Sequence, residues 1–258
     1  MAKNCLDLSS KVAVVFGASS GLGKAMSLGL AEHGADVVPT ARRVELLTDV
    51  CEQVKSLGRQ TLLTPSDVSD RASIRRLRDA VLADFGRIDI LLNAAGQTFR
   101  QPTLAVEDAA WASLFETNLT GVLHTCQEFY APLKQSGAGR VITIASLGSF
   151  VAFHEVAAYC ASKAAVLSLT RSLACEWACD GICVNAIAPG VFPTELNAHL
   201  LTGTDRGREI LQRTPMKRFG NPRELIGAVV LLASDAASFI TGECLVVDGG
   251  YLASGVNS

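Results

Sequence analysis

Short apolar runs alternate with longer amphipathic stretches along almost the whole chain. The runs are rich in β-branched residues, and the run at 12–15 is apolar at every position. A strand that is covered on both faces has no polar side, so such runs are typical of parallel strands inside a sheet. The seven runs that we expect to form strands are 11–16, 36–40, 60–64, 88–92, 140–145, 182–188 and 244–247.

Stretches of helical length separate these runs. They are 22–33, 44–57, 69–85, 109–133, 156–178 and 223–233. Neither an internal repeat nor a Pro/Gly/Ser-rich linker divides the chain, so the alternation predicts one α/β domain over residues 1–258. We expect a doubly wound Rossmann-type fold, in which helices cover both faces of a seven-stranded parallel sheet.

Residues 191–222 break this alternation, because they mix apolar and charged residues and contain Gly203 and Gly207. Long irregular segments in a compact domain are usually functional. We therefore expect a substrate lid at 191–222, with a plain surface excursion as the alternative.

The composition excludes several classes of protein. Of the 258 residues, 49% are hydrophobic and 19% are charged, which excludes a mainly disordered chain. The formal net charge of -2 lacks the excess of basic residues expected of a nucleic-acid-binding protein. No apolar stretch is long enough to cross a bilayer, and residues 1–10 lack the apolar segment of a signal peptide. We therefore expect a cytoplasmic protein without nucleic-acid or membrane partners.

The eight cysteines do not indicate a metal site. Cys175, Cys179 and Cys183 have four-residue spacing, but Gly181 interrupts the helix before the last of them. Zinc sites favour CxxC pairs or histidine partners, and the nearest downstream histidine is His199. We expect reduced thiols packed as small apolar side chains, and no metal.

A glycine-rich turn, Gly17-Ala18-Ser19-Ser20-Gly21-Leu22-Gly23, connects the first run to the first helix. Glycine lets a backbone approach a pyrophosphate closely, and a helix N-terminus directs N–H groups and partial positive charge toward it. The GxxxGxG spacing differs from GxGxxG, and glycines also serve plain tight turns. The position directly after the first strand favours a dinucleotide site.

The end of the second run bears on the choice of cofactor. An acidic residue there would accept hydrogen bonds from the ribose 2′-hydroxyl of NAD, but the chain has Thr40-Ala41-Arg42-Arg43. A guanidinium suits the 2′-phosphate of NADP, and Arg42 is our first candidate and Arg43 our second. The pair could also lie on a solvated helix start. The sequence favours NADP(H) and leaves NAD(H) possible.

Tyr159 and Lys163 are the candidate proton-transfer pair. Residues four apart share one face of a helix, so the ammonium can lie beside the phenol. A neighbouring cation favours the phenolate, so we expect a lowered pKa for Tyr159, which could then act as a general acid or base. A YxxxK sequence alone also fits an ordinary helix surface.

Further motifs lie at the ends of the predicted strands. They are Asn93-Ala94-Ala95-Gly96, Asn118, Ser146, Pro189-Gly190 and Val247-Asp248-Gly249-Gly250. With these motifs in this order, the chain resembles the short-chain dehydrogenase/reductase family from Lys11 to Gly250. Within that family the likeness is to sugar-acid and polyol dehydrogenases, such as gluconate 5-dehydrogenase, and to 3-oxoacyl-carrier-protein reductases.

The resemblance implies a role for each matching residue. Tyr159 would be the general acid/base, and Lys163 would lower its pKa and bind the nicotinamide ribose. Ser146 would hydrogen-bond the reacting oxygen, and Asn118 would hold a water in a proton relay. The remaining cofactor contacts that the resemblance implies are Asp67, Val68, Asn93, Ala94, Gly96, Pro189, Gly190 and Thr194. A homotetramer is also implied.

Two positions depart from the family pattern. Phe16 replaces the usual threonine before the glycine turn, and Ala94 replaces the second asparagine of the NNAG motif. Both departures put the rigidity of the turn and the cofactor affinity in doubt. Neither affects the proton-transfer residues.

The substrate pocket is expected between three segments, those after Gly96, after Ser146 and within the lid. Our candidate substrate residues are Gln97, Arg100, His154 and Phe192, and further candidates for the pocket wall are Phe99, Leu147, Phe153, Val191 and Leu196. Arg100 or His154 could orient an anionic or polyhydroxylated substrate, although either could be solvated or structural.

These residues favour an NADP-dependent oxidoreductase that interconverts a secondary alcohol and a ketone, with a sugar acid or polyol preferred as substrate. A 3-oxoacyl-carrier-protein reductase is the alternative, and it predicts a basic docking patch. The candidate patch contains Arg206, Arg208, Arg213, Lys217 and Arg218, with Asp205 and Glu209 opposing it. A non-catalytic dinucleotide sensor is a third hypothesis, disfavoured because Ser146, Tyr159 and Lys163 are all present.

Overall fold

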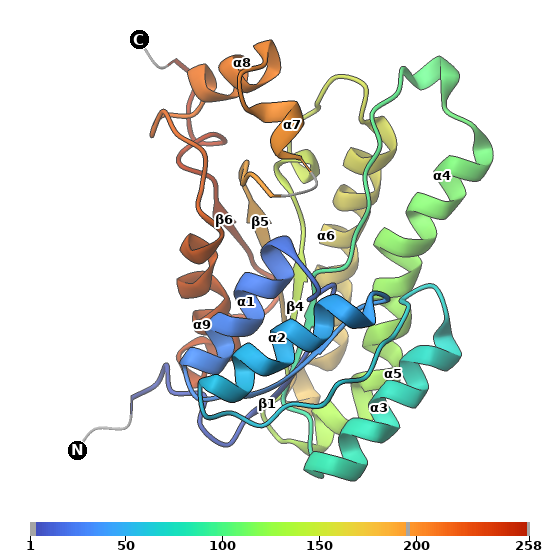
Figure 1. Ribbon diagram of the computed structural model, residues 1–258, viewed down its shortest axis with the longest axis vertical. Helices are drawn as coiled ribbons and strands as arrows, with labels where there is room; N and C mark the ends of the chain where they lie inside the picture. The colour runs from blue at the N-terminus through green and yellow to red at the C-terminus, as the bar shows by residue number, and fades with distance from the viewer. Residues whose placement is uncertain (1–3, 195–196, 257–258) are drawn as a thin grey trace.

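A parallel six-stranded sheet forms the centre of the molecule (Figure 1). The computed structural model describes residues 4–194 and 197–256. The strands follow the order β2-β1-β3-β4-β5-β6, with the chain reversing direction across the sheet between β2 and β3. Their bounds are β1 Val12–Phe16, β2 Asp36–Thr40, β3 Ile90–Asn93, β4 Arg140–Ile144, β5 Cys183–Pro189 and β6 Cys244–Val247.

Helices cover both faces of this sheet, which confirms the doubly wound fold class (Figure 1). Alternate residues of one strand serve opposite faces, since Val15 packs with Met26 and Val229 whereas Val14 packs with Leu77 and Phe129. The first face carries α1 Gly21–Glu32, α2 Val44–Ser56 and α9 Ile226–Ala233. The second face carries α3 Arg71–Phe85, α5 Gly121–Gln135 and α6 Ala157–Trp177.

The strand predicted at 60–64 is absent from the described sheet, so the sheet has six strands and not seven. The segment runs beside β2 and begins a pairing there, because Val37 N–H donates to the Gln60 carbonyl at 3.1 Å. The next N–H on that edge would come from Pro39, which has none to donate. The backbone ladder therefore does not continue, and the next hydrogen bond along this edge comes from a side chain, the Thr40 hydroxyl, which donates to the Thr64 carbonyl at 2.8 Å.

The helix predicted at 109–133 is divided by a wider turn. α4 Asp108–Phe115 leads into the π-helical turn η2 Glu116–Thr120, and α5 follows. A π turn inside a helix frequently marks a functional residue. Here it contains Asn118, one of the candidate site residues.

The segment at 191–222 contains two helices, α7 Ala198–Leu201 and α8 Asp205–Arg213, which lie at the top of the molecule in Figure 1. An apolar cluster joins this segment to the loop after β4, because Leu201 and Ile210 pack with Leu147 and Tyr251. Single-turn 3-10 helices complete the described structure at η1 Thr103–Ala105, η3 Leu147–Ser149, η4 Ala178–Asp180, η5 Pro222–Leu225 and η6 Asp235–Ala237.

Candidate active site

Ser146, Tyr159 and Lys163 converge where β4 ends. Ser146 precedes η3, and its Oγ accepts the Gly148 N–H at 3.0 Å. Tyr159 and Lys163 lie one turn apart in α6, and the Lys163 ammonium is 5.8 Å from the centre of the Tyr159 ring. Lys163 Nζ donates to the Ile144 carbonyl at 2.6 Å, which ties the helix to the strand that carries Ser146. The fold thus brings the three predicted residues together.

Burial dominates the acid–base properties of this trio. It raises the pKa of the Tyr159 phenol, although a hydrogen bond from Ser146 opposes the change. The expectation that Lys163 lowers this pKa is wrong for these groups alone, because the desolvation of the phenol outweighs the favourable contacts. Burial also lowers the pKa of Lys163 to about 8, since only 6% of the residue is exposed.

Asn118 connects the loop after β3 to α6. Its fully buried side chain accepts the Gln97 N–H at 2.8 Å, and its amide group donates to the Gln97 carbonyl at 2.9 Å and to Ser162 Oγ at 3.1 Å. The Gln97 side chain is engaged on α4, because its amide donates to the Ser113 carbonyl at 2.7 Å. Asn118 therefore fixes the main chain above Lys163, whereas its role in a proton relay stays a prediction.

The glycine-rich turn has the shape of a phosphate cradle. Gly17 has φ +79°, and a Cβ there would lie 2.5 Å from the Ala95 nitrogen, so no other residue fits without displacement. Ser20 precedes α1 without capping it through its side chain, so the first N–H groups of the helix face the turn. A pyrophosphate fits this arrangement of backbone donors.

The two departures from the family pattern have structural explanations. Phe16 is fully buried and packs edge-to-face on Phe129, with the ring centres 5.8 Å apart. The turn is held by main-chain bonds instead of a threonine hydroxyl, because Gly17 N–H donates to the Thr40 carbonyl at 2.9 Å. Ala94 N–H donates to the Phe16 carbonyl at 3.0 Å, so the backbone after β3 is also fixed.

Arg42 and Arg43 lie at the carboxyl end of β2 and differ in their partners. Arg43 Nη2 donates to Ser20 Oγ at 3.0 Å and to Ser19 Oγ at 3.2 Å, which places it against the turn. Arg42 is 4.0 Å from the Asp67 carboxylate, and its side chain is 77% exposed. Both guanidinium groups can therefore reach a phosphate beside the turn.

The other predicted cofactor residues line the same edge of the sheet. Asn93 is buried and accepts the Thr125 hydroxyl at 2.8 Å, and Val68 packs against Gly121. A Cβ at Gly96 would lie 3.4 Å from Asn118 Oδ1 and 3.6 Å from Lys163 Nζ, so this glycine lies directly beside both candidate site residues.

The end of β5 contributes further predicted cofactor residues to this edge of the sheet. Gly190 N–H donates to the Val247 carbonyl at 2.8 Å, directly after Pro189 ends the strand. Thr194 lies next to the start of α1, since its Cγ2 is 3.3 Å from the Cβ position of Gly21. The residues that the resemblance assigns to a dinucleotide therefore lie along the carboxyl edge of the sheet, and their role in cofactor binding stays a prediction.

The candidate substrate residues have different surroundings. Phe192 is 5% exposed and belongs to the apolar core beside α1 and α9. Arg100 and His154 are exposed, and both approach one oxygen of Glu155, Arg100 Nε at 2.7 Å and His154 Nδ1 at 3.6 Å. Sequence reasoning missed Glu155; its only signal is its position between His154 and the YxxxK helix.

The remaining pocket candidates mostly join the apolar cluster below the lid segment. Leu147 is buried there, and Val151, Phe153 and Val191 pack against it. Leu196 lies outside the described residues. A separate cavity of about 230 Å³ is lined by Val191, Phe192, Met216 and Phe219, among others, but not by Ser146, Tyr159 or Lys163.

Among the side chains that the structure describes, no three from His, Cys, Asp or Glu gather closely enough to hold a metal ion. Within the same residues, every helix is too short or too polar to traverse a bilayer.

A phosphate cradle next to a Ser-Tyr-Lys trio defines a dinucleotide-dependent oxidoreductase. The family model described as enoyl-(acyl carrier protein) reductase matches residues 17–252. The 2-dehydro-3-deoxy-D-gluconate 5-dehydrogenase of Dickeya dadantii is 39% identical and covers 98% of this chain and 100% of its own. The D-threitol dehydrogenase of Mycolicibacterium smegmatis is 38% identical and covers 95% of this chain and 94% of its own.

A solved structure of a gluconate 5-dehydrogenase from Burkholderia cenocepacia, in complex with NADP and tartrate, superposes with a TM-score of 0.92. It is 36% identical, and the match covers 97% of this chain and 98% of that one. The chain therefore belongs to the short-chain dehydrogenase/reductase family, which confirms the resemblance drawn from its motifs. It is an oxidoreductase of that family.

Proposed function

We propose that the protein interconverts a secondary alcohol and a ketone on a sugar acid, with NADP(H) as the hydride carrier. The observation that carries the substrate class is Arg100. This half-exposed guanidinium contacts Glu155 through Nε, and its Nη1 and Nη2 groups make no hydrogen bond with the part of the chain described. Two free N–H donors on one plane suit a carboxylate.

The cofactor would lie along the carboxyl edge of the sheet, against the residues described above. The glycine turn and the start of α1 would hold the pyrophosphate, and Arg42 and Arg43 would bind the 2′-phosphate that distinguishes NADP from NAD. Bound NADP(H) supplies or accepts the hydride. The protein's own contribution is to hold the reacting carbon beside it and to move the proton.

Proton transfer falls to Tyr159 and Lys163 in α6 and to Ser146, which directly precedes η3. During reduction, the Tyr159 hydroxyl gives its proton to the carbonyl oxygen, and Ser146 donates a hydrogen bond to the same oxygen. The charged form of Lys163 stabilises the Tyr159 phenolate. The Lys163 pKa of about 8 lets its ammonium group exchange protons near neutral pH. Oxidation runs through the same groups in reverse.

The carrier-protein alternative is weakened by the state of its predicted docking patch. Arg208 pairs with Asp205, and Arg218 forms a two-fold contact with Glu224 at 2.6 and 2.7 Å. Arg213 lies over the Tyr251 ring, 4.8 Å from its centre. Carboxylates thus neutralise two of the five basic side chains of the patch, which reduces the positive charge available to an acidic carrier protein.

A substrate panel tests the proposal. Sugar acids, polyols and 3-oxoacyl thioesters would be assayed with NADPH and NADH through the cofactor absorbance, with Tyr159→Phe as the inactive reference. We expect the highest kcat/KM for a sugar acid with NADP(H). Turnover of thioesters alone would favour the carrier-protein reductase, and NADPH binding without any turnover would favour a sensor.

We further propose, from family membership, that the protein is a cytoplasmic homotetramer and that residues 191–222 act as a lid. Light scattering on the purified protein tests the oligomeric state. Protection of 191–222 from proteolysis by NADP(H) and substrate tests the lid.

A further inference from the structure

Glu155 has an unusual backbone for its residue type. Its φ is +64°, a left-handed conformation that favours glycine, and Ser10 and Lys217 are the other non-glycine residues with positive φ in the described chain. Both ends of Glu155 are held by one loop, because its carboxylate contacts Arg100 and its carbonyl accepts the Gln101 N–H at 2.7 Å. Backbone strain that the surroundings maintain is a reason to look for a function.

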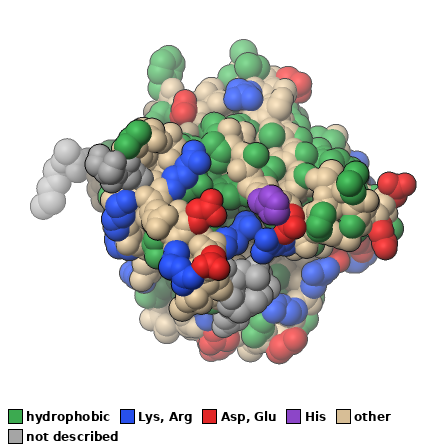
Figure 2. All heavy atoms as spheres, turned by 90° about the horizontal axis from the view of Figure 1, so that it is seen from above, with side chains coloured by type: hydrophobic (Ala, Val, Ile, Leu, Met, Phe, Trp, Pro, Cys, Tyr) green, Lys and Arg blue, Asp and Glu red, His purple; other side chains and the backbone are tan. Residues whose placement is uncertain are grey.

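The place of Glu155 in the fold connects it to the active site. It lies four residues before Tyr159, in the loop that precedes α6, and the loop that holds it begins at Gln97, which Asn118 fixes. This contact therefore joins the loops after β3 and β4, two neighbouring strands whose carboxyl ends form the site. Figure 2 shows this top face, where a histidine lies among acidic and basic side chains.

We propose that Glu155 is a specificity-determining residue, an inference that rests on the proposed function. The negative charge of Glu155 offsets the positive charge of Arg100. The rim formed by Arg100, His154 and Glu155 therefore stays close to neutral. His154 adds a charge only when it is protonated. Glu155 thereby lets the site accept uncharged polyols and limits its preference for anionic sugar acids.

Removing the charge of Glu155 should change the affinities for an anionic and an uncharged ligand by different amounts. Loss of the Glu155 carboxylate leaves Arg100 less firmly held, and this weakens the binding of an anion and of a polyol to a similar degree. The anion alone is also repelled by the Glu155 charge, so only its binding gains when that charge is removed. For two charges roughly 6 Å apart at a solvated rim, that repulsion corresponds to about a fivefold change in the ratio of affinities.

Tartrate and threitol provide a matched pair of probes, because both have four carbons and two central hydroxyls. Tartrate ends in carboxylates, whereas threitol ends in hydroxymethyl groups. Their dissociation constants would be measured by calorimetry with NADP⁺ present, for the wild type, Glu155→Gln and Glu155→Gly. Gln keeps the size and the strain, whereas Gly removes the side chain and accepts the positive φ. Ser10→Gly is the control for relieved strain away from the rim.

In both Glu155 variants we expect the ratio of the tartrate affinity to the threitol affinity to be about fivefold higher than in the wild type. This change should become smaller at high salt, because salt screens the charge of Glu155. A merely structural role would give opposite changes for Gln and Gly, and such a result would overturn the proposal. An unchanged ratio in both variants would overturn it as well. A wild type that binds neither compound would overturn the rim assignment itself, whereas binding without turnover of any sugar acid or polyol would refute only the proposed function.

Discussion

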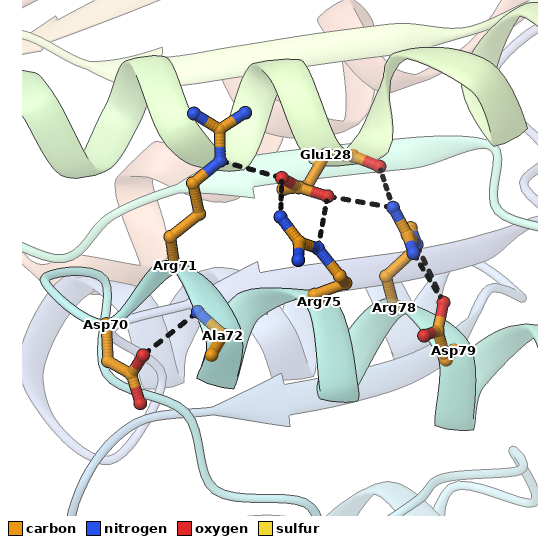
Figure 3. Close-up of polar contacts among 7 residues, drawn as sticks. All are labelled: Asp70, Arg71, Ala72, Arg75, Arg78, Asp79 and Glu128. Atoms are coloured by element: carbon orange, nitrogen blue, oxygen red, sulfur yellow. Dashed lines mark hydrogen bonds and ion pairs between the residues drawn. The ribbon is translucent and has the colours of Figure 1, made fainter.

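Among the glutamates that pair with arginine, Glu128 and Glu155 differ most clearly in how completely they are held. Glu128 in α5 is 7% exposed and contacts three arginines of α3, Arg71 at 2.7 Å, Arg78 at 2.8 Å and Arg75 at 3.2 Å (Figure 3). Glu155 at the active-site rim is 24% exposed and contacts one arginine. The Glu128 carboxylate is enclosed by donors, whereas the Glu155 pair leaves donors of its arginine free.

The backbones of the two residues differ in the same sense. Glu128 lies inside a regular helix, and its hydrogen bonds with Arg75 and then Arg71 hold its pKa at about 2. Glu155 lies in a loop with a left-handed φ. A satisfied ion pair on relaxed helices stabilises the fold, and a partly satisfied pair on a strained loop is available to a ligand. The comparison predicts which arginines affect folding and which affect kinetics.

The largest expected effect belongs to neither pair and sets the scale for both. Tyr159→Phe removes the hydroxyl that transfers the proton, so kcat should fall by roughly 10²–10⁴-fold. The thermal midpoint should stay close to that of the wild type, since the ring remains. Steady-state kinetics and a thermal melt measure the two quantities, and full turnover by the variant would remove Tyr159 from the mechanism.

Arg100→Leu should break the rim and leave the fold intact. Losing a charged donor pair to a substrate carboxylate costs about 2 kcal/mol, which corresponds to a roughly 30-fold rise in KM for a sugar acid. The matched control is Arg75→Leu, which removes an arginine of similar exposure from the Glu128 cluster. That control should lower the melting temperature and leave KM unchanged, and the opposite outcome would reverse our assignment of the two clusters.

Much of this fold could be predicted from the sequence, because buried strands and amphipathic helices are local patterns. The prediction of a strand at 60–64 was wrong for a non-local reason, because Pro39 on the neighbouring strand has no N–H to donate. Glu155 was not predicted as a site residue for another non-local reason. Its positive φ is set by the contacts with the loop of Arg100, and no local sequence pattern indicates it. The arginines at 71, 75 and 78 share one helix face, yet their partner Glu128 lies 50 to 57 residues away.

The Glu128 cluster should respond to pH as a paired carboxylate does. Its pKa falls from the ordinary 4.5 to about 2, so its contribution is fully present above pH 4.5 and is lost as the pH falls toward 2. Glu128→Gln should lower the free energy of unfolding by about 2 kcal/mol at neutral pH, with this difference vanishing in acid. Urea unfolding at several pH values measures it, and a difference independent of pH would show that charge is not the cause.

Arg42 tests whether incomplete pairing marks a ligand-binding arginine elsewhere in the molecule. Its 4.0 Å contact with Asp67 is looser than either glutamate cluster, so it should behave like Arg100 and not like Arg75. Arg42→Ala should raise KM for NADPH by about tenfold, or roughly 1.4 kcal/mol, because one guanidinium–phosphate contact is lost. KM for NADH and the melting temperature should stay unchanged, since NADH has no 2′-phosphate. Arg76→Ala is the control, because Arg76 is similarly exposed and pairs with Asp70 at 3.3 Å. An unchanged preference for NADPH would mean that Arg43, held against Ser19 and Ser20, carries the phosphate contact, and that loose pairing does not identify ligand-binding arginines.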